Sequence, residues 1–342
     1  MIVKKMPILQ GFPDFDTVKN LSKITPETSD FNPVFYDIET TGLSRYSTFL
    51  YLIGAAAYEN QSWHLYQWMA ENYEEEDQIL CEFFDFLKNK TCTIQFNGSR
   101  FDQPYLEERC RVRGYSSPFH GLPALDLYQE LKPCRPLLKL SRMKQPDLEA
   151  FLGLKKRIHC DGGKCIRLYK TYSKTKEMDL AETILGHNRE DLMGLGSVFT
   201  MLSYKTFYNG GYFPEKAVVQ DGSLILTLSL PFPLPVPVSA GKSGAFYLTA
   251  AEKEARLLIP LKQGRLRQYY KNFKDYYYLP GEDTAVPKAL GQYMDRSLRV
   301  PADARNCYTW FSCSEEFLED KGKQMQYLCH SLPCLLGLLE DA

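Results

Sequence analysis

The sequence of 342 residues has no run of about 18 apolar residues, the length that a membrane-spanning helix requires. Its richest apolar stretch, residues 224–238, is interrupted by four prolines. Residues 1–15 contain lysines but no continuous apolar stretch like that of a signal peptide. These absences predict a protein that has no membrane partner.

The sequence also lacks a regular cysteine spacing and a large net charge. The ten cysteines follow no framework spacing, so we expect reduced thiols and a cytoplasmic location. Lys and Arg number 41 against 42 Asp and Glu, and this balance neither indicates nor excludes a nucleic-acid partner. With 44% apolar and 24% charged residues, the chain has the composition of a globular protein of about two domains.

The distribution of charge is more informative than its sum. Acidic residues dominate residues 71–85, whereas residues 132–176 contain thirteen Lys or Arg against three acids. Such a local excess is typical of a segment that contacts phosphate backbones. A solvated loop is the alternative interpretation.

The most informative stretch is residues 34–43, Val-Phe-Tyr-Asp-Ile-Glu-Thr-Thr-Gly-Leu. It predicts a buried strand that ends at Thr-Thr-Gly. Side chains two apart on a strand point to the same face, so Asp37 and Glu39 project together. Two neighbouring buried carboxylates require a shared proton, a cationic partner or a divalent metal such as Mg²⁺.

The patterns that follow predict a mixed α/β domain. Strands are expected at residues 34–39, 49–58, 62–69, 91–96 and 124–127, and helices at 75–90, 101–113 and 180–204. Three antiparallel strands, then parallel strands, with helices on the faces, is the order of a ribonuclease H-like sheet.

The amino-acid composition changes after residue 210, and we predict that the chain has three parts. Residues 1–30 are an extended lead-in, residues 31–210 the ribonuclease H-like domain, and residues 211–342 a smaller α+β module. In this module we expect strands at 223–230, 245–249, 256–260 and 275–279 and a helix at 283–296, capped by Asp283 or Thr284.

Three segments each place an acid where a strand ends or along a helix that faces a sheet. Asp37 and Glu39 come first, Asp102 opens a helix directly after a strand, and His187 and Asp191 share a helical face. Four carboxylates and a histidine suit metal-assisted phosphodiester hydrolysis, in which two Mg²⁺ or Mn²⁺ ions about 4 Å apart activate water and stabilise the leaving oxygen. His187, with an ordinary pKa near ~6.5, is the candidate general base.

The motifs Asp37-Ile-Glu39-Thr-Thr-Gly, Asn97-Gly-x-x-Phe-Asp102 and His187-x-x-x-Asp191 resemble those of the DEDD (DnaQ-like) superfamily of 3′–5′ exonucleases, and among its members the YprB-like branch. The resemblance covers about residues 31–205. It implies a metal-dependent nuclease with Asp37, Glu39, Asp102 and Asp191 as ligands. It also implies His187 as the base and single-stranded 3′ ends as the substrate.

One spacing departs from that family. Its histidine class has His-x4-Asp and its tyrosine class has Tyr-x3-Asp, whereas this chain has His with the spacing of the tyrosine class. The departure concerns the role of His187 as base more than the four ligands. Without a metal site, Asp37 and Glu39 would pair with Lys or Arg, Asp102 would cap its helix, and His187 would be a core histidine.

Residues beside the motifs are candidates for substrate contact. By the resemblance, Thr40 and Leu43 lie against the terminal nucleotide, and a turn closed by Gly42 is the alternative. Asn97 contacts substrate or shapes the turn before Asp102. Arg100 is placed to meet a phosphate.

Two weaker patterns were also considered. His159, Cys160 and Cys165 have a spacing that invites zinc, but the segment is more typical of a loop. In residues 265–276, Lys and Arg alternate with Tyr and Phe, as in proteins that bind single strands, although core packing explains the same pattern.

The function predicted from sequence is thus a metal-dependent 3′–5′ exonuclease. A non-catalytic nucleic-acid-binding or scaffold protein on the same fold is the alternative, and an endonuclease is a third possibility. The sequence does not choose between DNA and RNA.

Overall fold

The computed structural model describes residues 1–24, 31–155, 157–158 and 162–339. It divides the chain into two compact units. The N-terminal unit comprises Met1–Lys132 and Arg142–Leu202, and the C-terminal unit comprises Pro133–Ser141 and Ser203–Ala342. Of the expected zinc segment, His159 and Cys160 lie outside the described residues, and Cys165 lies in a helix rather than a loop.

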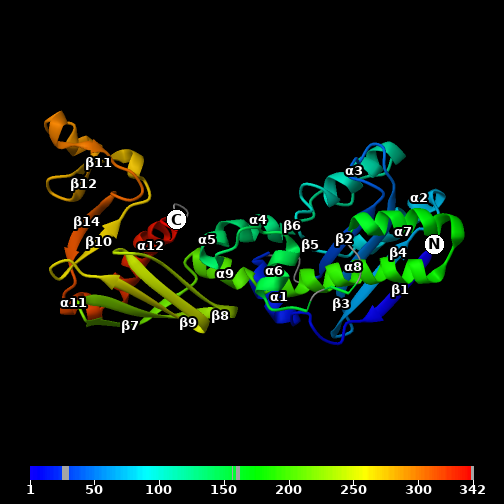
Figure 1. Ribbon diagram of the computed structural model, residues 1–342, viewed down its shortest axis with the longest axis horizontal. Helices are drawn as coiled ribbons and strands as arrows, with labels where there is room; N and C mark the ends of the chain where they lie inside the picture. Colours follow the sequence, from blue (N-terminus) through cyan, green and yellow to red (C-terminus); the bar gives the residue numbers. More distant parts are fainter. Residues whose placement is uncertain (25–30, 156, 159–161, 340–342) are drawn as a thin grey trace. The chain divides into compact units, whose positions relative to one another are not determined.

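The N-terminal unit is built on one six-stranded sheet (Figure 1). Its strands follow the order β1-β4-β3-β2-β5-β6. The pairs from β1 to β2 are antiparallel, whereas β5 is parallel to both β2 and β6. The strands are β1 (Ile2–Pro7), β2 (Pro33–Thr40), β3 (Leu50–Glu59), β4 (Ser62–Met69), β5 (Cys92–Gln95) and β6 (Ala124–Asp126). The ribonuclease H-like sheet expected from the sequence is confirmed.

Helices cover both faces of this sheet, and each face has its own core. On one face, Tyr36 and Ile38 of β2 join a cluster with Phe83 and Tyr105, which lie on α2 and α3. On the other face, α7 and α8 lie side by side (Figure 1) over a core that includes Tyr51. The helices of this unit are α1 (Phe15–Ser22), α2 (Glu76–Leu87), α3 (Asp102–Arg113), α4 (Leu127–Leu131), α6 (Gln145–Phe151), α7 (Gly162–Thr175) and α8 (Met178–Phe199).

Two elements differ from the sequence-based expectation. The lead-in expected at residues 1–30 contains α1 and the edge strand β1, which pairs with β4 from Ile2↔Met69 to Pro7↔His64. The side chains of β1 alternate only between half-buried and exposed, so the strand carries a weak hydrophobic pattern. The single helix expected at 180–204 ends at Phe199, and a second helix, α9 (Leu202–Tyr208), follows.

The C-terminal unit contains three small sheets in the orders β7-β8-β9, β10-β14 and β12-β11-β13. Its strands are β7 (Phe213–Gln220), β8 (Ser223–Lys242), β9 (Phe246–Pro260), β10 (Arg265–Tyr269), β11 (Tyr276–Leu279), β12 (Thr284–Pro287), β13 (Val300–Pro301) and β14 (Tyr308–Ser312). Its remaining helices are α5 (Arg135–Leu138), α10 (Lys288–Gly291), α11 (Glu315–Glu319) and α12 (Lys321–Gly337). The unit is therefore richer in strands than the sequence suggested.

The four prolines of the apolar stretch lie within one long strand, β8. They occupy alternate positions from Pro231 to Pro237, and all four are exposed. The pairing with β9 shifts register between Ser229 and Leu234 and again before Val238, because a proline has no N–H to donate to the ladder. The strand continues past the prolines because its buried face still alternates.

The helix expected at residues 283–296 is wrong. Residues 284–287 form β12, and only Lys288–Gly291 is helical. Asp283, expected as a helix cap, has a left-handed φ of 52°. Its carboxylate accepts hydrogen bonds from the hydroxyl groups of Tyr278 and Tyr308, so it ties two strands together instead.

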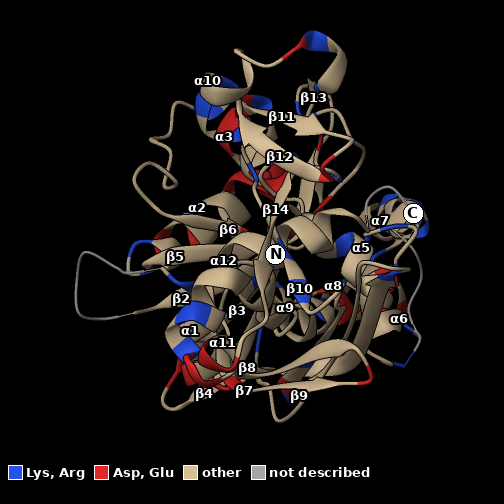
Figure 2. Cartoon of the chain, turned by 90° about the vertical axis from the view of Figure 1, so that its left-hand side faces the viewer, with Lys and Arg blue, Asp and Glu red and all other residues tan. Residues whose placement is uncertain are grey.

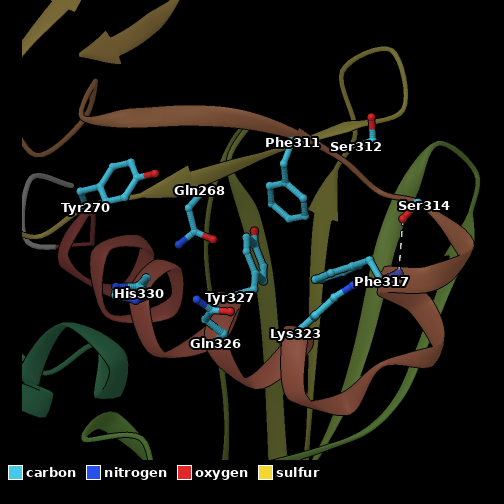
Figure 3. Close-up of a pocket in the computed structure, with 10 residues that line it drawn as sticks. All are labelled: Gln268, Tyr270, Phe311, Ser312, Ser314, Phe317, Lys323, Gln326, Tyr327 and His330. Atoms are coloured by element: carbon cyan, nitrogen blue, oxygen red, sulfur yellow. Dashed lines mark hydrogen bonds between the residues drawn. The ribbon is translucent and has the colours of Figure 1, made fainter. Parts of the chain in front are cut away.

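A pocket of about 430 Å³ lies between β10, β14 and the helices α11 and α12 (Figure 3). Phe311, Phe317 and Tyr327 form its aromatic floor and contact one another at ring-centroid distances of 5.3–5.8 Å. The full lining is Gln268, Tyr270, Phe311, Ser312, Ser314, Phe317, Lys323, Gln326, Tyr327 and His330.

Charged residues are interspersed along both units, with Lys and Arg among Asp and Glu on many elements (Figure 2). The basic–aromatic pattern of residues 265–276 is used in part for packing. The guanidinium group of Arg267 lies 4.6 Å from the ring centroid of Tyr308 and 5.0 Å from that of Trp310. No helix among the described residues has the length and apolar character needed to cross a membrane.

Candidate active site

Strand β2 carries Asp37 and Glu39 on the face of the sheet that α8 covers. The amide of Asn188, on α8, donates a hydrogen bond of 3.0 Å to Asp37 Oδ2. Glu39 Oε1 lies 3.2 Å from His187 Nε2, and Glu39 Oε2 accepts a hydrogen bond of 3.3 Å from the hydroxyl of Tyr51. Within the residues that the structure describes, neither carboxylate pairs with a Lys or Arg.

Asp102 reaches the same place from the start of α3. It is 7% exposed, and its Oδ1 accepts a hydrogen bond of 3.2 Å from the backbone N–H of Ile38, between the two acids of β2. The N-cap position belongs to Phe101, which makes no side-chain cap. The carboxylate of Asp102 therefore faces β2 rather than the end of its own helix.

His187 and Asp191 are one turn apart on α8 and meet each other above β2. His187 Nε2 lies 3.1 Å from Asp191 Oδ2 as well as close to Glu39, and the imidazole is 5% exposed. One ligand atom each from Glu39, His187 and Asp191 lie within 4.8 Å of one another. This is the spacing of groups that can hold one metal ion.

The electrostatics of the cluster show an excess of negative charge. Burial, and then the charges of Asp191, Asp102 and Glu39, raise the pKa of Asp37 well above its ordinary value. Burial raises the pKa of Asp102 to about 7 and that of Asp191 to about 6. Burial lowers the pKa of His187, but Glu39 and Asp191 outweigh it, so the net shift is upward. Apart from Arg157 at Asp191, no Lys or Arg among the described residues pairs with these acids. Their oxygen atoms and the imidazole nitrogen fit a divalent metal.

Residues 34–203 match the family model of the RNase_H superfamily. These residues have a ribonuclease H-like fold. The domain contains Asp37, Glu39, Asp102, His187 and Asp191, so the whole cluster lies within the matched region. A search of the curated proteins found none that matches the chain.

Several solved structures are similar to the chain at low identity. The family B DNA polymerase from the hyperthermophilic archaeon Pyrobaculum calidifontis is 14% identical, with a TM-score of 0.40, over 66% of this chain and 34% of that chain. Exonuclease I in complex with the inhibitor BCBP is 14% identical, with a TM-score of 0.31, over 58% of this chain and 56% of that chain. The match thus spans about a third of the polymerase and just over half of the exonuclease. The assignment of the fold rests on the family match and the strand order.

In the ribonuclease H-like domain, a second group of residues fixes the position of the acids. Asn188 is fully buried, and its Oδ1 accepts a hydrogen bond of 2.9 Å from Gln67 Nε2. Gly54 on β3 makes room for it, because a Cβ there would lie 2.0 Å from Asn188 Oδ1. The sequence analysis assigned no role to Asn188, although a polar residue at a buried helical position is a usable signal.

Arg157 and Glu149 form an ion-pair network that sequence reasoning missed. The guanidinium donates two hydrogen bonds to Glu149, of 2.9 Å from Nε and 2.6 Å from Nη2, and a third from Nη1 to Asp191 Oδ1. The basic segment was interpreted as a contact for phosphates. Part of its charge is instead directed toward the acids of the same domain.

The loop before Asp102 is shaped by Asp126. Its carboxylate accepts hydrogen bonds from the backbone N–H of Asn97 (2.8 Å) and from the hydroxyl of Ser99. Asn97 has a left-handed φ of 57°, and a Cβ at Gly98 would lie 2.3 Å from Gln95 Oε1. Turn chemistry therefore accounts for the Asn-Gly pair, and a substrate contact of Asn97 stays a prediction.

The segment after Glu39 ends in a hollow of about 410 Å³. Thr40 is buried and donates its hydroxyl hydrogen to Gly42 O at 2.7 Å, which closes the turn. Leu43 is 87% exposed and lines the hollow together with Arg100. The full lining is Leu43, Ser44, Arg45, Tyr46, Arg100, Phe101 and Pro104. Of the four candidates for substrate contact, Leu43 and Arg100 thus share one surface, while Thr40 and Asn97 hold turns.

Proposed function

We propose that the protein is a metal-dependent 3′–5′ exonuclease that hydrolyses phosphodiester bonds of nucleic acids at single-stranded ends. The observation that carries the proposal is the convergence of Glu39, His187 and Asp191 within 4.8 Å, next to two further buried carboxylates. The match to the RNase H superfamily supports a nuclease in general terms. The 3′–5′ direction of cleavage, the need for a metal and the mechanism are the parts that we propose.

Asp37, Glu39, Asp102 and Asp191 are the residues that would hold two Mg²⁺ or Mn²⁺ ions. When bound, such ions lower the pKa of a water molecule and stabilise the charge on the leaving oxygen. The chain prepares the donors for this task. Asn188 orients Asp37, Tyr51 orients Glu39, and the N–H of Ile38 orients Asp102.

His187 is the group that would accept the proton of the attacking water, at Nε2. This atom is the one that points toward Glu39 and Asp191. The two carboxylates stabilise the charged imidazolium that results, as the raised pKa of His187 indicates.

The hollow beside Glu39 is suited to the end of the substrate strand. Leu43 provides an exposed apolar side chain for a base, and the exposed side chain of Arg100 provides a cation for a phosphate. Arg45 adds a second cation on the same lining.

The test is incubation with 3′- and 5′-labelled single-stranded DNA and RNA in Mg²⁺ or Mn²⁺. We expect stepwise shortening from the 3′ end. In Asp191→Asn we expect the cleavage rate to fall on the order of 1,000-fold, because loss of a metal ligand weakens the stabilisation of the transition-state charge by several kcal/mol. Asp179→Asn is the matched control, since Asp179 is an exposed acid on the same helix. Failure of the wild type to shorten either substrate would refute the proposal.

The same assay separates the other candidate functions. Salt-dependent binding of oligonucleotides without metal and without turnover would favour a non-catalytic nucleic-acid-binding protein. A ladder of internal cuts in a uniformly labelled substrate would favour an endonuclease.

A further inference from the structure

Arg157 is held against the candidate site by a carboxylate that is not part of it. Its Nε and Nη2 donate to the two oxygens of Glu149, at 2.9 and 2.6 Å, which is the side-on fork geometry of a strong arginine–carboxylate pair. Its Nη1 donates to Asp191 Oδ1. The side chain is 21% exposed, so the pair is partly shielded from solvent.

The anchor of Arg157 does not depend on Asp191. Gln145 Nε2 donates a hydrogen bond of 3.0 Å to Glu149 Oε1. Glu149 also packs directly over Gly194 of α8, where a Cβ would lie 1.9 Å from Oε1. Glu149 is 7% exposed and is therefore fixed on several sides. If Asp191 turned its carboxylate toward a cation, Arg157 would stay in place.

In that event the Nη1 group of Arg157 would lose its acceptor beside the cation site. A partly buried guanidinium donor without an acceptor is costly, so another acceptor would replace Asp191 beside it, and an anion suits the charge best. A phosphate oxygen of a bound strand has this charge and suits the planar donor.

We propose that Arg157 is a further catalytic residue, which donates from Nη1 to the phosphate that is to be cleaved and gives up Asp191 in exchange. This inference rests on the proposed nuclease function. In the metal-free protein, Arg157 takes the place of a cation at Asp191. In the loaded protein, it stabilises the negative charge that develops on the phosphate.

The exchange gives Arg157 two effects of opposite sign. It competes with metal for Asp191, so its removal strengthens metal binding. It also stabilises the transition state, so its removal slows cleavage. A residue that only supports the structure would weaken both properties together.

The experiment compares Arg157→Gln with the wild type in two measurements. By calorimetric titration with Mn²⁺ alone, we expect the variant to bind about fivefold more tightly, since a competing ion pair and a repelling charge are gone. In single-turnover cleavage with Mn²⁺, we expect a rate about 100-fold lower, the typical effect of losing one donor to a developing charge. Free guanidinium ion added to Arg157→Gly is expected to restore part of this rate.

Arg142→Gln is the matched control. Arg142 is a neighbouring cation, 70% exposed, whose partner Asp147 at 3.1 Å lies outside the site. We expect unchanged metal affinity and unchanged cleavage. Arg157→Lys, which keeps the charge, provides a second variant if Arg157→Gln fails to fold, and it is expected to recover metal competition but little of the rate, because lysine has no planar fork.

The result that overturns the inference is Arg157→Gln with weaker or unchanged Mn²⁺ binding, or either Arg157→Gln or Arg157→Lys with a wild-type cleavage rate. Absence of cleavage in the wild type would instead refute the proposed function. The two failures are distinguishable because the Mn²⁺ titration does not depend on turnover.

Discussion

The two units each bury acidic side chains, but they treat them in opposite ways. In the C-terminal unit, Asp283 receives hydrogen bonds from Tyr308, from Tyr278 (2.7 Å) and from Lys262 Nζ (2.9 Å). Against the effect of burial, these donors lower its pKa to about 2. In the N-terminal unit, Asp37 has one side-chain donor, Asn188, and a pKa raised well above its ordinary value.

The difference separates carboxylates that serve the fold from those that serve a ligand. Asp126 behaves like Asp283, because two backbone N–H groups and a hydroxyl of the preceding loop donate to it. Asp37 and Asp102 have few donors for their charges, and Asp191 shares its cationic neighbours, Arg157 and His187, with Glu149 and Glu39. A fold that keeps such an imbalance at one place is prepared for a cation from outside the chain.

The largest effect is expected from neutralising one acid of the candidate site that has few hydrogen-bond donors. In Asp102→Asn the amide oxygen still accepts from the N–H of Ile38, but one negative charge is lost. We expect cleavage to fall on the order of 1,000-fold, as for loss of a metal ligand. We also expect the metal-free variant to be more stable than the wild type, because a buried charge is gone. Cleavage rates and thermal unfolding in chelator measure the two effects, and a destabilised variant would contradict the distinction.

The same kind of substitution in the C-terminal unit is expected to have the opposite effect on stability. In Asp283→Asn the charge that Lys262 and two tyrosine hydroxyls stabilise is removed. We expect a loss of about 2 kcal/mol in the free energy of unfolding, the typical value for hydrogen bonds to a charged group. Cleavage by the N-terminal unit is expected to be unchanged at temperatures where the variant is folded. Chemical denaturation gives the first quantity, and a gain in stability would show that Asp283 resembles the site acids after all.

The smallest expected effect is a pH dependence in the metal-free protein. Asp102 and Asp191 have pKa values of about 7 and about 6 when folded, above the ordinary 3.8, so the folded state binds protons more tightly. Stability from this source is present at low pH and is lost as the pH rises through 6 and 7. We expect a midpoint of thermal unfolding about 3 °C lower at pH 8 than at pH 5 in chelator. Mn²⁺ and Asp102→Asn are each expected to flatten this dependence, whereas Asp283 contributes only at pH values approaching 2, where its stabilising charge is lost.

Much of the N-terminal fold was predictable because its signals are local. The strand period around Asp37, the helix at residues 75–90 and the strand before Asp102 are each encoded in a few adjacent residues. The face shared by His187 and Asp191 follows from helical spacing. That these segments meet follows from strand order in a mixed sheet, which the sequence pattern supports.

What the sequence did not reveal depends on contacts between distant segments. Nothing near Arg157 indicates that its partners are Glu149 and Asp191, because a cation in a basic segment is ordinarily solvated. The strand β1 has no strong pattern of its own and is defined by the edge of β4. Aspartate is a common helix cap, so the sequence places Asp283 at the start of a helix. Its hydrogen bonds from Tyr278 and Tyr308, on two other strands, are what make it a link between strands.

The close approach of Gly54 to Asn188 limits how far α8 can slide over the sheet. The helix that carries His187 approaches the backbone of β3 closely at Gly54, where the side chains of Asn188 and Leu192 fill the space that a Cβ would need. Any sliding of α8 would therefore displace the amide that orients Asp37.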